Sequence, residues 1–253
     1  MPTWQSRNFL IGMRLLRDQV RSFAEYPFNI PAIGGLDELT FEQPATFFIG
    51  ENGSGKSTLL EAIAVSFGLN PEGGSRNFNF ATRASHSDLN KYLRLVRSPR
   101  RVRDRYFLRA ESYFNVATEI ETLDREPFGG SKIINSYGGR SLHEQSHGES
   151  FLDIAVNRLG PRGFYLFDEP EAALSVRGQL ALIRRMHELV LERSQFVVAT
   201  HSPILLGYPE ATILELSEDG IRSVGYEETE QVELTRSFLE NPGRFLRHLL
   251  ADD

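Results

Sequence analysis

The chain has 253 residues, 40% hydrophobic and 25% charged, which is the composition of a folded globular protein with a sizeable core. It contains no cysteine, which excludes disulfide scaffolds, thiol nucleophiles and cysteine-ligated metal centres. The net charge of −6 argues against a protein covered with nucleic acid, and no apolar run is long enough for a membrane span or an export signal. The sequence therefore predicts a cytoplasmic protein without membrane insertion.

The charge is unevenly distributed along the chain. Ten basic and two acidic residues lie between Ser75 and Ala110, so this segment carries +8 and the rest of the chain −14. A dipolar protein of this kind can hold a polyanion at its basic segment while it stays acidic overall. Two interpretations are open for residues 75–110: a solvated charged surface, or a contact with nucleic acid.

Strand and helix patterns alternate along the chain. Apolar runs typical of buried strands occupy Phe47–Ile49, Tyr106–Arg109, Phe164–Phe167 and Phe196–Ala199, and helical spacing occupies Ser57–Phe67 and Gln179–Arg193. A strand pair turning at Asp219-Gly220 and a final helix interrupted near Pro242 follow, over Thr212–Leu216, Ile221–Tyr226 and Glu230–Leu250. This alternation predicts an α/β fold with a parallel-sheet core, whose ligands lie at the carboxyl ends of the strands.

The segment Gly50–Ser57 reads GENGSGKS and matches the pattern GxxxxGK followed by Ser or Thr, between a strand and a helix. Its glycines allow a tight turn in which backbone N–H groups point at phosphate oxygens, and the helix dipole adds to the field. Lys56 is expected on the β- and γ-phosphates, Ser57 on Mg²⁺ and Thr58 on the α-phosphate. The predicted nucleotide-binding residues here are Gly50, Glu51, Asn52, Gly53, Ser54, Gly55, Lys56, Ser57 and Thr58.

The strand Phe164–Phe167 ends in two adjacent carboxylates, Asp168 and Glu169. Asp168 is expected to hold Mg²⁺ through water, and Glu169 to activate the attacking water as general base. A protein that only senses nucleotide can dispense with the second carboxylate, so Glu169 favours hydrolysis. The chain has no Asn-Lys-x-Asp loop for guanine, which indicates ATP.

A possible zinc motif, HExxH, spans His143 to His147. It requires both histidines on one continuous helix. However, Ser146 followed by Glu149 forms a capping box, which predicts that the helix begins at Ser146 and leaves His143 outside it. The sequence therefore argues against a zinc site.

Further segments carry a resemblance to a known family. The run Asp168–Ser175 looks like the second carboxylate motif and D-loop of ABC-type ATPases, Thr200-His201-Ser202 resembles their switch histidine loop, and Ser146–Glu149 is similar to their signature loop. Over Gly50–Ser202 these motifs keep the family's order. The chain resembles the stand-alone ABC-type ATPases of the AAA family, related to chromosome-maintenance, recombination-repair and OLD-type ATPase heads.

This resemblance implies several features of fold, site and partners. It implies a P-loop ATPase fold with an antiparallel N-terminal β portion, and a single domain over residues 1–253 with a reduced helical subdomain at about 112–160. His201 is expected on the γ-phosphate as a catalytic residue beside Glu169 and Lys56. Ser146, Gly148 and Glu149 are expected to contact the nucleotide of a second subunit in a head-to-tail homodimer.

The sequence also departs from the family pattern. No glutamine lies between Lys56 and Gln145, so the glutamine of the family's Q-loop is missing. Glu111, after the strand at 106–109, is the candidate substitute facing Mg²⁺, and Arg109 is the alternative. Tyr26 and Phe28 are the two candidates for stacking on adenine.

Together these observations predict a Mg²⁺-dependent ATPase that closes as a dimer on ATP and reopens on hydrolysis. Its expected partners are nucleic acid, through residues 75–110, or an effector protein such as a nuclease or toxin, in repair or defence. Two other functions remain open: the ATP-binding subunit of an ABC transporter, and a regulatory module that binds ATP without hydrolysing it.

Overall fold

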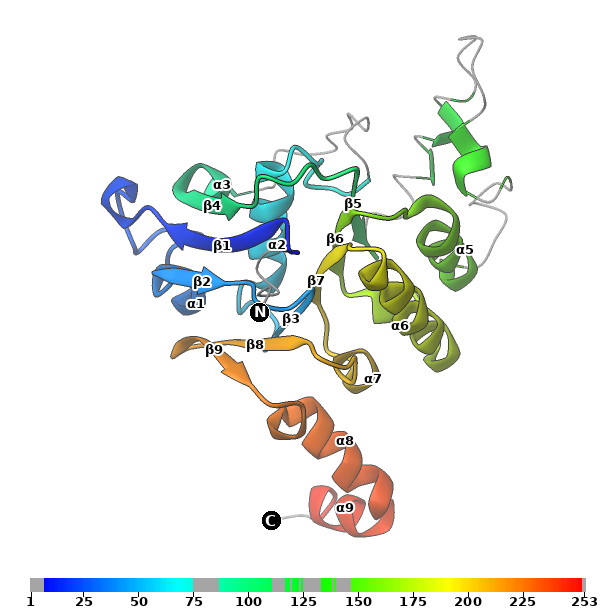
Figure 1. Cartoon of the computed structure of the whole chain (residues 1–253). Coiled ribbons are helices and arrows are strands. Elements are labelled where there is room, and N and C mark those ends of the chain that lie inside the picture. Colours follow the sequence, from blue (N-terminus) through cyan, green and yellow to red (C-terminus); the bar gives the residue numbers. More distant parts are fainter. Residues whose placement is uncertain are drawn as a thin grey trace.

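A six-stranded sheet forms the centre of the computed structural model, which describes residues 7–74, 87–110, 117–118, 120–122, 124, 133–137, 139 and 147–251 (Figure 1). The strand order is β5-β6-β7-β3-β8-β9, and every neighbouring pair is parallel except β8 and β9. The strands are β3 (Ala45–Ile49), β5 (Asp104–Arg109), β6 (Gly163–Asp168), β7 (Gln195–Ala199), β8 (Thr212–Ser217) and β9 (Gly220–Val224). The expected α/β fold with a parallel core is confirmed.

A second sheet is antiparallel and has the order β2-β1-β4. Its strands are β1 (Leu10–Leu15), β2 (Glu38–Thr40) and β4 (Leu93–Arg97). This sheet confirms the antiparallel N-terminal portion. The strand β4 comes from the basic segment, so part of that segment is a sheet strand.

Helices cover both faces of the central sheet (Figure 1). Leu59 and Ile63 of α2 pack with Leu10 and Phe48 in the core between the two sheets, whereas Phe47, one residue before Phe48, points to the opposite core. The helices are α1 (Pro31–Gly34), α2 (Lys56–Ser66), α3 (Leu89–Tyr92), α5 (His147–Asp153), α6 (Val176–Leu191), α7 (Pro203–Leu206), α8 (Glu230–Glu240) and α9 (Pro242–Leu249). None in the described part of the chain is long and apolar enough to cross a bilayer.

The helical region before β6 departs from a single regular helix. The α-helix α5 passes into one π-helical turn at Ile154–Arg158, and residues 117–118, 120–122 and 124 are helical. Leu182 of α6 packs with Phe151 of α5 on the face of the sheet opposite α2. The boundaries of a helical subdomain at about 112–160, and the single domain over the whole chain, stay predictions.

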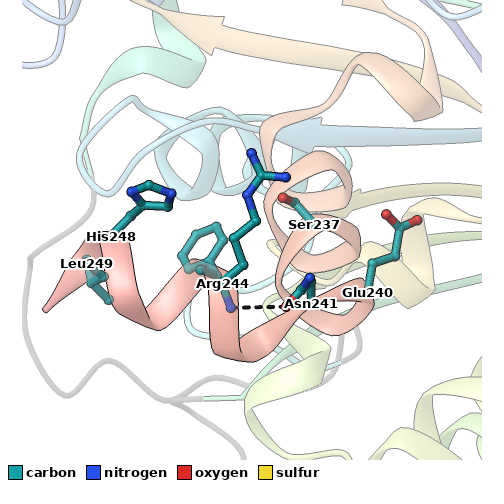
Figure 2. Close-up of a pocket in the computed structure, with 7 residues that line it drawn as sticks. Ser237, Glu240, Asn241, Arg244, His248 and Leu249 are labelled. Carbon is teal, nitrogen blue, oxygen red and sulfur yellow. Dashed lines mark hydrogen bonds between the residues drawn. The ribbon is translucent and has the colours of Figure 1, made fainter. Parts of the chain in front are cut away.

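The final helix is interrupted as expected, because Asn241 begins a new helix. Its side-chain oxygen accepts a hydrogen bond from the Arg244 backbone N–H at 3.0 Å. Figure 2 shows the hollow of about 620 Å³ that α8 and α9 form, lined by Ser237, Glu240, Asn241, Arg244, Phe245, His248 and Leu249. All these residues belong to the C-terminal helices or their junction, so the hollow is separate from the phosphate loop.

Gln195 at the start of β7 joins the two sheets. Its side chain is buried, and its Oε1 accepts hydrogen bonds from the backbone N–H groups of Phe9 and Leu10 at 2.8 and 2.9 Å. Its Nε2 donates to the Leu10 carbonyl at 2.9 Å. One side chain thus satisfies three backbone groups at the beginning of β1.

We expect Gln195→Leu to lower the free energy of unfolding by about 2–4 kcal/mol, because three buried backbone groups lose their partner in a site of nearly unchanged volume. Chemical denaturation with a fluorescence or circular-dichroism readout measures this difference. The matched control is Gln19→Leu at an exposed position, for which we expect a change within about 0.5 kcal/mol. Equal effects of the two substitutions would contradict the role assigned to Gln195.

Candidate nucleotide-binding site

The glycine-rich loop connects the carboxyl end of β3 to the first turn of α2. Gly50 has φ 138° and Gly55, the residue that caps α2, has φ 100°, both in the region that favours glycine. A Cβ on Gly50 would lie 2.2 Å from the Leu216 carbonyl oxygen of β8. The loop therefore needs glycine at Gly50 for two reasons, the backbone conformation and the close approach of the neighbouring strand.

Lys56 lies inside this loop. Its Nζ donates hydrogen bonds to the carbonyl oxygens of Gly50 and Glu51 at 2.8 and 2.9 Å, and the residue is buried. Burial lowers the pKa of the Lys56 ammonium from its ordinary value, while Glu169, Asp168 and Glu171 oppose that shift. The loop thus holds a positive charge at its centre, next to a group of carboxylates.

Asp168 ends the buried strand β6 and contacts the loop directly. Ser57 Oγ donates a hydrogen bond to Asp168 Oδ1 at 2.9 Å. Burial raises the pKa of the Asp168 carboxyl to about 6, although Arg109 and the bond from Ser57 act in the opposite direction. These two oxygens, from positions far apart in the sequence, meet at the carboxyl edge of the sheet.

Arg109 at the carboxyl end of β5 belongs to the same cluster. Its Nε lies 3.3 Å from Asp168 Oδ2, and its Nη1 lies 2.6 Å from Glu61 Oε1 on α2. All three side chains are largely buried. Arg109, one of the two candidates for the missing glutamine, thus contacts the proposed metal-holding carboxylate. Glu111, the other candidate, lies outside the described residues.

Glu169 and His201 face each other across neighbouring strand ends. His201 Nε2 is 3.9 Å from Glu169 Oε1. Glu169 has φ 50°, a left-handed conformation that costs a non-glycine residue about 1–2 kcal/mol. Its backbone is held there because its N–H donates to the Ala199 carbonyl of β7 at 3.0 Å.

Sequence patterns gave no indication of what holds the histidine. Glu171 Oε1 accepts a hydrogen bond from the His201 backbone N–H at 2.5 Å. Behind it, Ser202 Oγ donates to Gln179 Oε1 of α6 at 2.5 Å. These partners lie 30 and 23 residues apart in the chain, so only the fold brings them together.

The two candidates for adenine stacking differ in their surroundings. Phe28 packs edge-on against Tyr92, with ring centroids 5.0 Å apart, and contacts Phe23. Tyr26 is 59% exposed, and its hydroxyl lies 3.3 Å from Thr58 Oγ1 on α2. Of the two, Tyr26 has a ring that is open to a ligand beside the phosphate loop.

The segment expected to form the signature loop is described in part. Ser146 lies outside the described residues, whereas Gly148 and Glu149 occupy the first turn of α5. A Cβ on Gly148 would lie 2.9 Å from the Ala173 carbonyl oxygen. This helix start therefore packs against the segment that follows Glu169. The helix α5 begins at His147. Because His143 lies outside the described residues, the expected absence of a zinc site stays a prediction.

Two buried polar atoms beside the loop have no hydrogen-bond partner in the described part of the chain, Ser54 Oγ and His201 Nε2. Buried polar atoms are normally paired, so these positions suit phosphate oxygens. For Mg²⁺, Ser57 and Asp168 offer hard oxygen ligands. The described residues include no group of three metal-binding side chains, so water and phosphate would complete the shell, as Mg²⁺ prefers. The residues present therefore fit both a phosphate group and Mg²⁺.

We expect Gly50→Ala to cost about 2–5 kcal/mol of stability and to weaken nucleotide binding, because it adds a clash with Leu216 to a strained backbone. Gly53→Ala is the matched control, since Gly53 also has a positive φ of 84° but no atom within 4 Å of its added Cβ. Calorimetric melting and titration with a fluorescent ATP analogue measure both effects. A larger loss in Gly53→Ala would contradict the argument from close approach.

Known proteins resemble this chain in sequence and in fold. The family model described as AAA domain matches residues 20–141. The chromosome partition protein Smc of Methanocaldococcus jannaschii is 28% identical over 158 residues, which cover 54% of this chain and 13% of that protein. The cytochrome c biogenesis ATP-binding export protein CcmA of Rhodopseudomonas palustris is 28% identical over 183 residues, which cover 67% of this chain and 84% of that protein. The chain thus spans a small part of the Smc relative.

Solved structures show the same fold. An ATP-binding cassette of an ABC transporter in its ADP conformation aligns with a TM-score of 0.51 and 17% identity, covering 96% of this chain and 99% of the other. CbiO1 from Clostridium perfringens, part of an ABC transporter complex, aligns with a TM-score of 0.50 and 13% identity, and it also covers 96% of this chain and 99% of the other. Taken with the phosphate loop and the paired carboxylates, these matches support the resemblance to P-loop ATPases of the ABC/AAA type, and the solved structures show that the chain shares the fold of ATP-binding cassettes.

Proposed function

We propose that this chain binds ATP with Mg²⁺ at the loop Gly50–Ser57 and hydrolyses it with Glu169 as general base. The observation that carries the proposal is the approach of Glu169 and His201 to within 3.9 Å at the strand ends next to that loop. A general base must lie within reach of the water it activates, and a second polar group must hold the phosphate end. Both groups are present here beside Lys56.

Binding in this proposal depends on the loop and the first turn of α2. The N–H groups of the loop and the Lys56 ammonium hold the β- and γ-phosphates, while Thr58 contacts the α-phosphate and Tyr26 stacks on adenine. When Mg²⁺ is bound, Ser57 would ligate it, and Asp168 and Glu111 would hold it through water. When bound, Mg²⁺ supplies positive charge that neutralises the β- and γ-phosphate oxygens.

Hydrolysis then depends on residues at the ends of β6 and β7. Glu169 accepts a proton from water as that water attacks the γ-phosphorus, the bond from the γ-phosphorus to the bridging oxygen breaks, and ADP leaves with that oxygen. His201 donates a hydrogen bond that holds the γ-phosphate. The bond from His201 N–H to Glu171 fixes the histidine backbone, which limits its motion during the reaction. Arg109 keeps Asp168 ionised next to Ser57, so it is a positioning residue.

A second copy of the chain would complete the site. In one protomer the side chains of Glu169 and His201 are 40% and 35% exposed, and His201 shares a cavity of about 660 Å³ with loop residues Gly50–Ser54. Hydrolysis of ATP proceeds best when bulk water is excluded. In a head-to-tail homodimer, Ser146, Gly148 and Glu149 of each protomer would cover the γ-phosphate of the other. ATP would close this dimer and hydrolysis would reopen it.

In this proposal the dimer that opens and closes with ATP acts in the cytoplasm. It acts on nucleic acid or on an effector protein such as a nuclease or toxin, in repair or defence. The similarity to CcmA supports a second candidate, the ATP-binding subunit of an export complex. ATP turnover that DNA stimulates would support action on nucleic acid. ATP turnover that does not change with DNA, together with co-purification of a membrane permease from the native host, would support the export subunit.

We expect Glu169→Gln to lower the turnover number about 10²–10⁴-fold while ATP binding is retained, because the amide cannot accept the proton from water. The variant should accumulate as an ATP-bound dimer in size-exclusion chromatography with light scattering. The matched control is Glu210→Gln, an exposed glutamate with a similar left-handed φ of 54°, which should keep wild-type turnover.

A non-hydrolysing regulatory module would behave differently in the same assay. In that case the wild-type chain would itself stay bound to ATP for hours, and Glu169→Gln would change nothing. That result would reject hydrolysis while leaving nucleotide binding intact.

A further inference from the structure

Five arginines from three separate parts of the chain gather at one edge of the central sheet. Arg100, Arg101 and Arg103 precede β5, Arg162 precedes β6 and Arg193 precedes β7. These strands pair in parallel register, Asp104 with Gly163 and Phe164 with Gln195, so their amino ends lie side by side. Together with Phe9 the five arginines line a hollow of about 560 Å³, here called the arginine hollow.

The arginine hollow is distinct from the nucleotide site. In a parallel sheet all amino ends lie at one edge and all carboxyl ends at the other. The phosphate loop, Asp168 and His201 follow the carboxyl ends of β3, β6 and β7. The arginine hollow lies at the opposite edge, so a ligand there leaves the nucleotide site and its covering subunit undisturbed.

The other basic residues of the segment 75–110 that the structure describes have partners of their own for the most part. Arg105 donates to the Phe67 carbonyl at 2.9 Å, Arg97 lies over the Phe67 ring, and Arg109 pairs with Glu61. Lys91 pairs with Asp88. The basic segment is therefore not one uniform surface, and most of its described charge outside the arginine hollow is used within the fold.

Within the arginine hollow the positive charges are not compensated. In the part of the chain that the structure describes, none of its five arginines forms an ion pair with a carboxylate. Two acids adjoin these arginines in sequence, Asp104 beside Arg103 and Glu192 beside Arg193. Asp104 is engaged by Arg158 at 2.9 Å and by the Tyr165 hydroxyl at 3.0 Å, and Glu192 forms no ion pair within the described residues. The Arg100 guanidinium donates to the backbone carbonyl of Arg7 at 3.2 Å. Five guanidinium groups thus face one hollow without a counter-charge from the described protein.

Two of these arginines also sit in a strained backbone conformation. Arg162 has φ 55° and Arg193 has φ 68°, where glycine or asparagine would fit with less strain. The Arg162 backbone is held by two bonds, because the Arg103 N–H donates to its carbonyl at 3.0 Å and its own N–H donates to the Glu192 carbonyl at 3.1 Å. The Arg193 N–H donates to the Val190 carbonyl at 2.9 Å. Strain of this kind persists where function requires the side chain.

We propose that the arginine hollow binds the phosphodiester backbone of nucleic acid without reading its sequence. Guanidinium groups match phosphate oxygens in geometry and charge. The lining contains one aromatic residue, Phe9, which is only 4% exposed and offers no face for a base. Since neighbouring strands lie about 4.8 Å apart, the arginines from β5 to β7 span about 10 Å, wider than a single phosphate group.

Binding at this hollow stands independently of the proposed hydrolysis, and only its coupling to ATP rests on the proposed function. The test therefore uses the full chain without nucleotide. Fluorescence anisotropy with a labelled 30-base-pair duplex of random sequence measures the affinity over a series of salt concentrations. For wild type we expect the affinity to fall steeply as the salt concentration rises. In a plot of the logarithm of the association constant against the logarithm of the salt concentration, each phosphate contacted should contribute about −0.9 to the slope.

The decisive variant is Arg162→Gly combined with Arg193→Gly. It removes two charges and also relieves the backbone strain, so the melting temperature should stay level or rise. We expect the affinity for the duplex to fall at least tenfold and the salt slope to decrease by about two. The matched control, Arg184→Ala with Arg222→Ala, removes two exposed arginines elsewhere and should keep the slope.

Three outcomes would overturn the proposal: no binding of wild type at low salt, an equal loss in the control variant, or tighter binding of inorganic tripolyphosphate than of the duplex. The last outcome would assign the hollow to a small polyphosphate. Wild type that binds the duplex but shows no ATP turnover would count against the proposed function and leave this site standing.

Discussion

The parallel pairing of β7 with both β3 and β6 is the constraint on which the rest of the structure depends. It aligns the carboxyl ends of three strands that are far apart in the chain. As a result the loop after β3 meets the carboxylates after β6, and Ser57 reaches Asp168 at 2.9 Å. The same alignment brings His201, after β7, opposite Glu169. Without this strand order, the motifs would be three unconnected segments.

The cost of burying charge explains how the site is assembled. Lys56, Asp168, Arg109 and Glu61 are buried or largely buried, and each lies near a group of opposite charge or a carbonyl oxygen. Burial alone lowers the pKa of Lys56 and raises that of Asp168, so both charges are disfavoured until neighbours compensate them. A phosphate chain with a divalent cation supplies further charge of both signs to the same cluster.

Backbone strain marks both edges of the sheet. Of the four non-glycine residues with positive φ in the described chain, Glu169 lies at the carboxyl edge, and Arg162 and Arg193 lie at the amino edge. Each donates a backbone hydrogen bond: Glu169 and Arg162 donate to a neighbouring segment, and Arg193 donates to the last turn of α6. A rigid sheet can thus support strained residues at two opposite edges, which keeps the proposed nucleotide site and the proposed polyanion site apart.

The sequence by itself determined the local features: the phosphate loop, the carboxylate pair after β6, the alternation of strands with helices, and the helix break at Asn241. These follow from periodicity and turn chemistry within short windows. Only the tertiary structure decided two contacts in the nucleotide site, that of Arg109 with Asp168 and that of Glu171 with His201. It also decided that Gln195 joins the two sheets and that Arg162 and Arg193 lie beside Arg100–Arg103. Such contacts join residues far apart in the chain, and their geometry depends on strand order and register, which no local pattern encodes.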